Sequence, residues 1–403
     1  MSVIAKSRLS RFALGIAESE TLKMAQMARD LRAKGHDVIS LSLGEPDFDT
    51  PVHIKKAAMQ ALEDGYTKYT PVQGLPELTK AIAEKFKREN NLDYAVNQIV
   101  VSTGAKQTIA NVALSLLEEG DECIIFTPYW VSYEVIVKMT GATPVYVKAG
   151  IDQDFKVTAQ QVSDAITDRT KMVLFSSPCN PTGSVFSKEE LKAIADVLAP
   201  HEDIFIVSDE IYEHINFTGE RHTSIGSFPG VKDRTITVNG FAKGFSMTGW
   251  RLGYMGAPKW LADACNRIQG QFTSGAASFS QKAGAFALDA DLEPTHKMRD
   301  TFLKRRDMMI RLLSAIPGLK VNHPQGAFYL FPDVSAYFGK TDGTTVIKNA
   351  DDFADYIMLN AFVGLVSGSA FGDDNCVRIS YAASDAQLKE AVKRIGEAVV
   401  KLK

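Results

Sequence analysis

The chain has 403 residues and a formal net charge of −3, with 45% hydrophobic and 23% charged residues. These fractions are normal for a globular protein, and the length predicts two domains of about 100–200 residues each. The slightly negative charge argues against the basic surface of a nucleic-acid or anionic-membrane binder. No apolar run reaches the roughly 18 residues of a membrane span, so no such span is expected.

The N-terminal stretch, residues 1–22, mixes charged and apolar side chains and lacks the apolar run and cleavage site of a secretory signal. We therefore expect a cytoplasmic protein. The cysteines are far apart in the sequence and form no Cys-x-x-Cys pair; they are Cys123, Cys179, Cys265 and Cys376. Neither a disulfide framework nor a zinc site is expected from this spacing.

Helical and strand-like segments alternate from about residue 50 to residue 289. Periodic apolar residues predict helices within residues 70–90, 108–120, 187–201 and 258–272. The second of these should stop at Gly120, and Ser187 with Glu190 forms a capping-box pattern at the start of the third. Strands are expected within residues 97–104, 122–130, 171–183, 203–212, 234–243 and 251–258. Their near-continuous Val, Ile, Leu and Phe runs indicate burial on both faces of a mostly parallel sheet.

The two ends of the chain have a different pattern, with short strands between longer helices. Helices are expected over residues 20–35, 293–318 and 383–403, and short strands within residues 38–44, 326–334 and 376–382. We therefore predict a large α/β domain over residues 50–289 and a smaller α+β domain over residues 290–403. Residues 1–49 are expected to form an N-terminal arm and part of the smaller domain.

Polar and aromatic side chains gather where the predicted strands end. In open α/β sheets, ligands bind beyond the carboxyl ends of the strands. The segments in question are residues 102–107, 127–130, 176–183, 208–212 and 243–251. Taken alone, each has a plain structural explanation: Trp130 could be packing, Asp209 a helix cap and Lys243 a surface charge. Their occurrence in order at successive strand ends favours one shared site.

These segments together offer Gly-rich backbone at a helix start, an aromatic plate, an amide, a carboxylate, a phenol, an amine and a guanidinium. Pyridoxal 5′-phosphate (PLP) needs this whole set. Its aldehyde bonds a lysine, its ring nitrogen stays protonated beside a carboxylate, and its flat ring packs on an aromatic side chain. Its phosphate binds backbone N–H groups and an arginine. The sequence therefore predicts PLP as the cofactor.

Eight motifs in a characteristic order extend this prediction over essentially the whole chain. They are LSLGEPDFDTP, KYTPVQG, STGAKQ, PYWVSY, SSPCNPTG, VSDEIYEHI, NGFAKGFSMTGWRLGY and CVRISYA. With them the chain resembles the class I, fold-type-I PLP-dependent aminotransferases, and among these most the bacterial class Ib aspartate aminotransferases. The resemblance implies a large domain with a mostly parallel seven-stranded sheet flanked by helices. It also implies a smaller α+β domain built from both termini.

The resemblance implies a role for each residue that contacts the cofactor ring. Lys243 would bond the aldehyde and move the substrate proton, and Asp209 would hold the proton on the ring nitrogen. Tyr212 and Asn180 would donate hydrogen bonds to the ring oxygen, and Trp130 would lie against the ring.

The phosphate and the substrate have their own implied partners. The backbone at Gly104, Ala105 and Lys106, together with Arg251, would bind the phosphate. Tyr69 would reach the phosphate of a partner subunit, which implies a homodimer with shared sites.

Arg378 and the backbone of Gly44 would hold the α-carboxylate of the substrate, with Asn180 and Trp130 also facing it. Lys106 would meet a distal carboxylate. One departure from many relatives is that Gly240 and Ala242 stand where hydroxyl residues often precede the lysine, so a phosphate contact is expected to be absent there.

The implied reaction is ping-pong transfer of an amino group from L-aspartate to 2-oxoglutarate, giving oxaloacetate and L-glutamate. Transamination of aromatic amino acids, prephenate or other 2-oxo acids is an alternative, as is a PLP lyase on the same scaffold. A DNA-binding regulator is disfavoured, since only a short arm precedes the first motif. A nucleotide-binding protein is disfavoured because neither Gly-rich nucleotide motif follows a strand.

Overall fold

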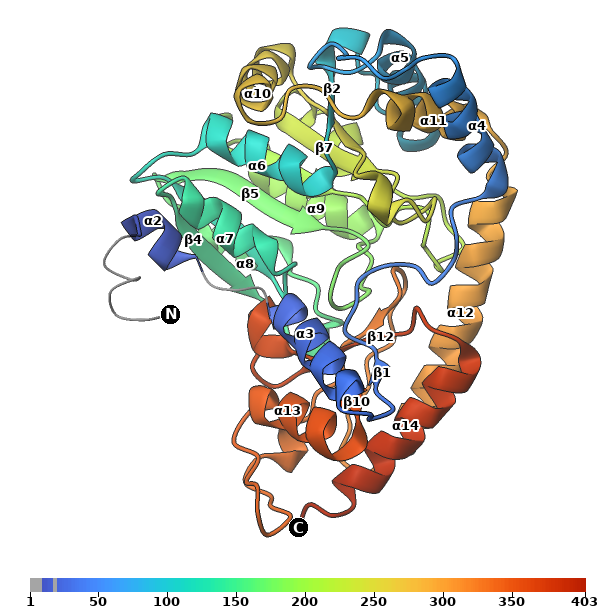
Figure 1. Ribbon diagram of the computed structural model, residues 1–403. Helices are drawn as coiled ribbons and strands as arrows, with labels where there is room; N and C mark the ends of the chain where they lie inside the picture. The colour runs from blue at the N-terminus through green and yellow to red at the C-terminus, as the bar shows by residue number, and fades with distance from the viewer. Residues whose placement is uncertain (1–8, 17–19) are drawn as a thin grey trace.

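A seven-stranded sheet forms the centre of the larger part of the computed structural model, which describes residues 9–16 and 20–403 (Figure 1). Its strand order is β2-β8-β7-β6-β5-β3-β4. The strands are β2 (Ile99–Ser102), β3 (Glu122–Thr127), β4 (Thr143–Lys148), β5 (Thr170–Ser176), β6 (Phe205–Asp209), β7 (Thr235–Gly240) and β8 (Gly253–Gly256). Neighbours from β4 to β7 pair in parallel, whereas β8 runs antiparallel to both β7 and β2. The predicted mostly parallel sheet is confirmed.

Helices cover both faces of this sheet (Figure 1). Alternate side chains of a strand point to opposite faces, so Met172 and Leu174 of β5 join one apolar cluster while Val173 and Phe175 join another. The first cluster is covered by α6 (Ala105–Leu116), α7 (Ser132–Met139) and α10 (Lys259–Phe272). The opposite face is covered by α4 (Val52–Glu63), α5 (Pro76–Lys85), α8 (Ala159–Ala165), α9 (Lys188–Leu198) and α11 (Ser278–Asp289).

The smaller unit combines segments from both ends of the chain. Strand β1 (Ile39–Ser40) pairs in parallel with β10 (Val363–Gly364), and β11 (Val366–Ser367), β12 (Val377–Ser380) and β9 (Tyr329–Leu330) form an antiparallel sheet. The helices of this unit are α3 (Glu20–Ala33), α12 (Glu293–Leu313), α13 (Ala350–Ala361) and α14 (Asp385–Val399), and the short α2 (Arg11–Gly15) precedes them. The helix α12 runs along both units (Figure 1). The predicted second unit built from both termini is confirmed, while the numerical domain limits stay a prediction.

The helix α6 begins and ends earlier in the sequence than predicted. It ends at Leu116 rather than at Gly120, because Leu117 is buried in an extended conformation with φ −109° and the chain then turns. The carboxylate of Asp121 accepts a hydrogen bond from the backbone of Glu118 at 3.0 Å, and Gly120 takes φ +101° in the same turn. The Ser187–Glu190 capping box at the start of α9 is confirmed.

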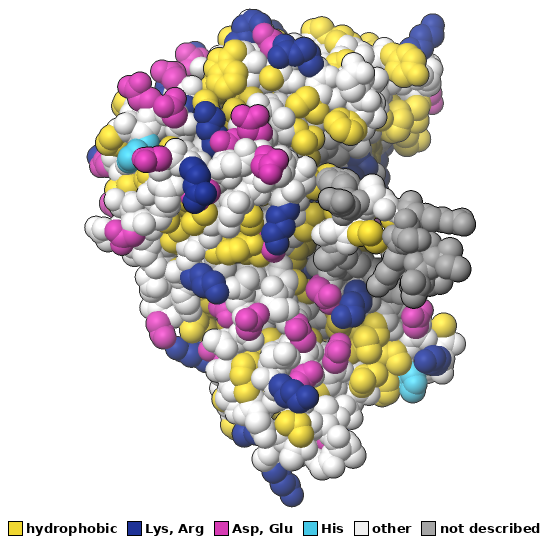
Figure 2. All heavy atoms as spheres, turned by 90° about the vertical axis from the view of Figure 1, so that its left-hand side faces the viewer, with side chains coloured by type: hydrophobic (Ala, Val, Ile, Leu, Met, Phe, Trp, Pro, Cys, Tyr) yellow, Lys and Arg dark blue, Asp and Glu magenta, His cyan; other side chains and the backbone are white. Residues whose placement is uncertain are grey.

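Surface charge is mixed on the face shown in Figure 2, where Lys and Arg side chains alternate with Asp and Glu instead of gathering by sign. Within residues 9–16 and 20–403, no helix has the length and apolar character needed to cross a membrane.

Candidate active site

The carboxyl ends of three parallel strands bring the predicted site residues together. In the register of the sheet, Ser176 at the end of β5 pairs with Asp209 at the end of β6, and Asp209 pairs with Val238 of β7. The loops that follow these strands carry Asn180, Tyr212 and Lys243. All of them border one cavity of about 300 Å³. Of the predicted site residues, those lining this cavity are Gly44, Gly104, Ala105, Lys106, Trp130, Asn180, Asp209, Tyr212, Lys243, Arg251 and Arg378.

The carboxylate of Asp209 is buried at the floor of the cavity. Its Oδ2 accepts a hydrogen bond from the Tyr133 hydroxyl at 2.7 Å, and its Oδ1 accepts one from the Ile211 backbone at 3.2 Å. In the described ranges it forms no ion pair with Lys, Arg or His within 4.0 Å. Burial raises the pKa of Asp209 to about 6, although the hydrogen bond from Tyr133 lowers it. This carboxylate therefore suits a cationic N–H donor from a ligand.

The amine of Lys243 lies in the same cavity, on the turn that follows β7. It donates a hydrogen bond to the backbone carbonyl of Gly44 and lies 5.7 Å from the centre of the Tyr212 ring. Burial lowers the pKa of Lys243, and with the added effect of the nearby Arg378 cation that pKa is about 8. A substantial fraction of this amine is therefore neutral near pH 8, as a nucleophile or general base requires.

One edge of the cavity is the N-terminus of α6. Gly104 precedes the helix with φ +86°, and a Cβ atom there would lie 2.5 Å from Nη2 of Arg251. Arg251 itself takes a left-handed conformation with φ +53°, and its Nη1 donates to the Thr248 carbonyl at 2.9 Å. The first backbone N–H groups of a helix have no partner within the helix. Together with the guanidinium they form an anion site.

The positions without a hydroxyl differ in the space around them. A Cβ atom on Gly240 would lie 3.0 Å from both the Cα of Gly253 and the carbonyl of Leu252. The close approach of β7 and β8 therefore leaves little room for a serine at residue 240. Ala242, by contrast, lines the cavity.

A second guanidinium, that of Arg378 on β12, lies within the cavity wall, and this residue is 2% exposed. Its Nη1 donates to Oδ1 of Asn180 at 2.9 Å, and its Nη2 donates to the Ser42 carbonyl at 2.7 Å. The Nε is buried without a hydrogen-bond partner in the described chain. The guanidinium also packs on the ring of Tyr329, 4.7 Å from its centre. A buried arginine with donor capacity to spare suits a carboxylate ligand.

Lys106 contributes a further cation. Its Nζ lies 5.0 Å from the centre of the Trp130 ring, and both residues line the cavity. Burial lowers the pKa of Lys106, and the charge of Arg251 adds to that effect. Among the residues that the structure describes, no carboxylate forms an ion pair with it.

Sequence reasoning missed several residues of the site. The hydroxyl of Tyr329 lies 2.7 Å from that of Tyr212, and the hydroxyl of Tyr133 contacts Asp209. Both tyrosines lie in segments that the sequence singled out, PYWVSY and GAFYLFPDV, but no pattern showed which side they face. Thr21 and Leu22 of α3 also line the cavity, and their sequence carries no signal for it.

Tyr69, also predicted as a site residue, lies outside the cavity that the other predicted residues line. It is 98% exposed and does not border the cavity of its own chain.

The family model for aminotransferase class I and II matches residues 36–395. The chain belongs to this family. Its PLP-dependent transaminase chemistry and its fold type I architecture follow from that membership and from the solved relatives.

Relatives of this aminotransferase are similar along nearly its whole length. A bifunctional aspartate aminotransferase and glutamate/aspartate-prephenate aminotransferase of Petunia hybrida is 46% identical over 392 residues, which is 96% of this chain and 82% of that protein. An aspartate/prephenate aminotransferase of Cereibacter sphaeroides is 45% identical, covering 94% of this chain and 96% of its own.

Solved structures agree with the fold. The aspartate aminotransferase of Rhizobium meliloti has a TM-score of 0.95 at 43% identity and covers 98% of this chain and 100% of its own. The Thermus thermophilus aspartate aminotransferase with maleate has a TM-score of 0.91 at 39% identity, covering 97% of this chain and 99% of its own.

The residues of the cavity fit PLP. Asp209 is a buried carboxylate that has no cationic partner in the described ranges. The start of α6 at Gly104, together with Arg251, forms an anion site. Ser176 also borders the cavity, with a buried Oγ that has no hydrogen-bond partner in the described ranges. These groups match the ring nitrogen and the phosphate in charge and in hydrogen-bonding type.

Proposed function

We propose that this aminotransferase transfers the amino group of L-aspartate to 2-oxoglutarate, giving oxaloacetate and L-glutamate. The observation that carries this proposal is the pair Arg378 and Lys106, two cations that line the same cavity as Lys243. A dicarboxylic substrate has two anionic groups to pair with them. The relatives named as aspartate aminotransferases, one of them solved with the dicarboxylate maleate, support the same choice.

The central catalytic role in the proposed reaction belongs to Lys243. PLP, when bound, supplies an aldehyde that bonds an amine and a ring that withdraws electrons from the substrate carbon. Lys243 is the residue that would hold the aldehyde carbon until the substrate amine takes its place. The amine of Lys243, then free, would accept the proton from the substrate Cα and return it to the cofactor side. Its pKa of about 8 supports this role, since the neutral amine is the form that accepts a proton.

The ring would be held by groups on three sides. Asp209 would keep the ring nitrogen protonated, and the hydroxyl of Tyr212 and the amide of Asn180 would donate to the ring oxygen. Trp130 would lie against the ring face. In support, all of these side chains border the cavity, and Asp209 and Tyr212 are buried and held by hydrogen bonds to Tyr133 and Tyr329.

The phosphate would lie at the start of α6. We assign it the backbone N–H groups of Ala105 and Lys106 together with the Arg251 guanidinium. The predicted contact from the N–H of Gly104 is not included, because that group donates to the Ser102 carbonyl at 2.7 Å. The proximity of Arg251 to Gly104 supports this assignment.

The substrate would be fixed by its carboxylates. Arg378 would bind the α-carboxylate, with the backbone of Gly44 beside it, and Asn180 would present Arg378 in the correct orientation through the 2.9 Å hydrogen bond between them. Lys106 would bind the distal carboxylate from the Trp130 side of the cavity.

We also infer a homodimer in which Tyr69 reaches the phosphate of the partner subunit. Its hydroxyphenyl group is 98% exposed in one chain, which is unusual for a tyrosine. The helices α4 and α11 pack together, and both expose large apolar side chains. These are Val52, Met59, Leu62 and Phe286. An exposed apolar surface of this kind is typical of a subunit interface. Light scattering should give twice the chain mass of 44.1 kDa.

We propose the cytoplasm as its compartment. All four cysteines are buried free thiols, which is typical of proteins kept in a reducing environment.

Steady-state kinetics with paired amino and oxo acids test the proposed substrate. We expect kcat/KM for L-aspartate to exceed that for L-alanine and L-phenylalanine. Lys106→Met should lower kcat/KM for aspartate at least tenfold and leave that for alanine within about threefold, because alanine has no distal carboxylate. A higher kcat/KM for alanine or phenylalanine than for aspartate in the wild type would refute the substrate assignment. Continued turnover of the amino acid in an assay that contains no 2-oxo acid as acceptor would indicate a lyase.

A second candidate is transamination of prephenate or aromatic amino acids. The observation that favours it is the apolar part of the cavity lining, which includes Leu22, Trp130 and Ile211. Leu22 lies on α3 and is 62% exposed, so a larger side chain of the substrate could cover it. The names of the Petunia and Cereibacter relatives point the same way. Assays with prephenate and L-glutamate separate this activity from the first.

A further inference from the structure

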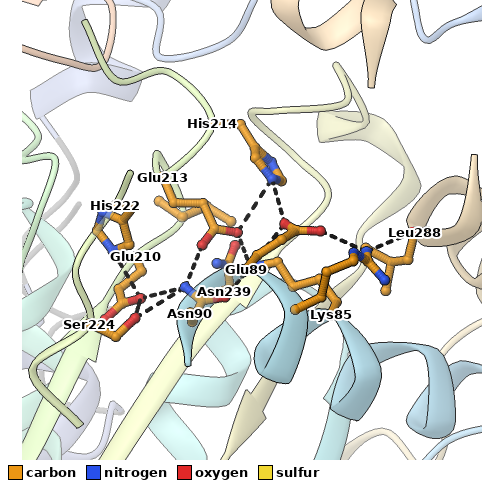
Figure 3. Close-up of polar contacts among 12 residues, drawn as sticks. Lys85, Glu89, Asn90, Glu210, Glu213, His214, His222, Ser224, Asn239 and Leu288 are labelled. Atoms are coloured by element: carbon orange, nitrogen blue, oxygen red, sulfur yellow. Dashed lines mark hydrogen bonds and ion pairs between the residues drawn. The ribbon is translucent and has the colours of Figure 1, made fainter. Parts of the chain in front are cut away.

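The side chains of the segment Asp209–Glu213 point into two different environments. Asp209 and Tyr212 line the active-site cavity, whereas Glu210 and Glu213 do not. These two glutamates are 1% and 6% exposed and belong to a group of mostly buried polar side chains, of which Arg88 is exposed (Figure 3). We call this group the back network; its members are Lys85, Arg88, Glu89, Asn90, Glu210, Glu213, His214, His222 and Ser224.

Asn90 is the hub of the back network. Its Nδ2 lies within hydrogen-bond distance of Glu213 Oε2 at 2.7 Å, of Ser224 Oγ at 3.1 Å and of Glu210 Oε2 at 3.3 Å. Its Oδ1 accepts a hydrogen bond from Lys85 Nζ at 2.7 Å, and the same ammonium pairs with Glu213 (Figure 3). One amide therefore links both glutamates of the segment to the same lysine.

A short π-helical turn brings Lys85 and Asn90 together. The helix α5 ends at Lys85, and residues Phe86–Asn90 continue it as a π-helix that Asn91 closes with φ +56°. In a π-helix, residues five apart are neighbours, and such turns are frequent at functional sites. Lys85 and Asn90 are five apart, so the turn presents both side chains to Glu213. Lys85 has no exposed surface.

Each carboxylate of the back network already has a basic side chain as its partner. Glu213 pairs with Lys85, Glu210 lies 3.0 Å from His222, and Glu89 contacts Arg88 at 2.6 Å. Burial alone would raise the pKa of Glu213, but Lys85 and His214 lower it to about 2. Two sets of these carboxylates and histidines are spaced like metal ligands. The Lys85 ammonium at Glu213, however, makes the cluster an ion-pair network.

The back network also reaches the strand that leads to Lys243. Asn239 of β7 stands four residues before Lys243, and its Nδ2 is buried without a hydrogen-bond partner in the described ranges. The backbone of Glu210 donates to the Val238 carbonyl at 2.8 Å, which joins the Asp209–Glu213 segment to the same strand.

We propose that Lys85 and Asn90 are positioning residues for this aminotransferase: through Glu210 and Glu213 they fix the segment that presents Asp209 and Tyr212 to the cofactor. The proposal rests on the cofactor role proposed above for Asp209. Because the anchors and the functional side chains alternate along five residues, a shift of Glu210 or Glu213 moves Asp209 and Tyr212 with them. Held on both sides, Asp209 keeps the direction that a ring N–H requires.

The test compares Lys85→Met and Asn90→Ala with the control Arg234→Met. Arg234 is also buried and directly precedes β7, at the end of that strand away from the cavity. Its guanidinium donates to the carbonyls of Leu198, Ala199, Ile204 and Gly230. Each full-length apoprotein is titrated with PLP, and backbone hydrogen exchange over residues 209–213 is measured. We expect both network variants to bind PLP at least tenfold more weakly and to exchange faster over this segment. Arg234→Met should lower the melting temperature and keep the PLP dissociation constant within twofold of the wild type.

The proposal is overturned if folded Lys85→Met and Asn90→Ala proteins bind PLP within twofold of the wild type and keep the exchange rates of residues 209–213. If Lys85→Met does not fold, Asn90→Ala and Glu213→Gln are judged by the same thresholds. Asp209→Asn separates this outcome from a failure of the proposed function. If Asp209→Asn alone leaves PLP binding unchanged, the role of Asp209 is wrong, and the exchange rates then decide whether Lys85 and Asn90 hold the segment.

Discussion

The hydroxyl of Tyr133 on α7 donates a 2.7 Å hydrogen bond to the carboxylate of Asp209 at the end of β6. Burial raises the pKa of Asp209, and this bond opposes that rise by stabilising the ionised form. The tyrosine is 0% exposed and thus has no competing contact with solvent. A group outside the predicted set of site residues therefore helps to keep the carboxylate charged for the ring nitrogen.

Tyr133→Phe should weaken PLP binding. A hydrogen bond to a charged group contributes about 1.5–3 kcal/mol, so we expect at least a tenfold rise in the PLP dissociation constant near pH 7, measured by fluorescence titration of the apoprotein. Tyr356→Phe is the control, because its buried hydroxyl donates to the Ala398 carbonyl in the smaller unit. An unchanged dissociation constant in Tyr133→Phe would show that the bond has no effect on the carboxylate.

Asp209→Asn should make the apoprotein more stable and the enzyme inactive. The pKa of Asp209 is about 6 in the folded chain against 3.8 for an ordinary aspartate, so folding at neutral pH places an ionised carboxylate in an unfavourable site. This rise in pKa corresponds to about 3 kcal/mol. We expect a higher melting temperature of the apoprotein and at least a hundredfold loss of kcat.

The stability difference between these two apoproteins should depend on pH. The native wild type binds more protons than the unfolded chain between pH 4 and 6, so its stability rises relative to Asp209→Asn as the pH falls through this window. Denaturant unfolding at pH 7.5 and pH 4.5 measures the change. A constant difference across the window would contradict a raised pKa for Asp209.

The reaction of Lys243 with PLP should depend on pH around its lowered pKa of about 8. The neutral amine is the reactive form, so the rate of covalent attachment to the apoprotein, trapped with borohydride, should rise about tenfold per pH unit up to pH 8 and then level off. Peptide mass analysis should place the adduct on Lys243, and Lys243→Ala should lack it. A rate that keeps rising above pH 9 would indicate an ordinary lysine.

Gly104→Ala should impair PLP binding through the Arg251 guanidinium. The new Cβ would lie 2.5 Å from Nη2 of Arg251, and φ of +86° strains any residue other than glycine by about 1 kcal/mol or more. Gly120→Ala is a matched control, since Gly120 has φ +101° but no atom within 4 Å of a new Cβ. Both variants should melt earlier, and only Gly104→Ala should raise the PLP dissociation constant at least tenfold. Equal dissociation constants in the two variants would argue against the phosphate site.

The candidate site could largely be predicted from the sequence because the strands of the large sheet are mostly parallel. Consecutive buried strands end at the same edge of such a sheet, so residues placed after them, such as Asn180, Asp209 and Lys243, had to meet. The antiparallel direction of β8 could not be predicted, since buried strands of either direction have the same apolar run.

By itself, the sequence determined six of the seven strands of the large sheet, the family and the set of chemical groups at the strand ends, because these depend on local patterning and on motifs. Only the tertiary structure decided which side chains support them. Tyr133 contacts Asp209 across 76 positions, and Lys85 contacts Glu213 across 128. Such contacts depend on how helices pack on the sheet and on one π-helical turn. The periodicity of the sequence cannot predict which buried side chain will contact a carboxylate that is distant along the chain.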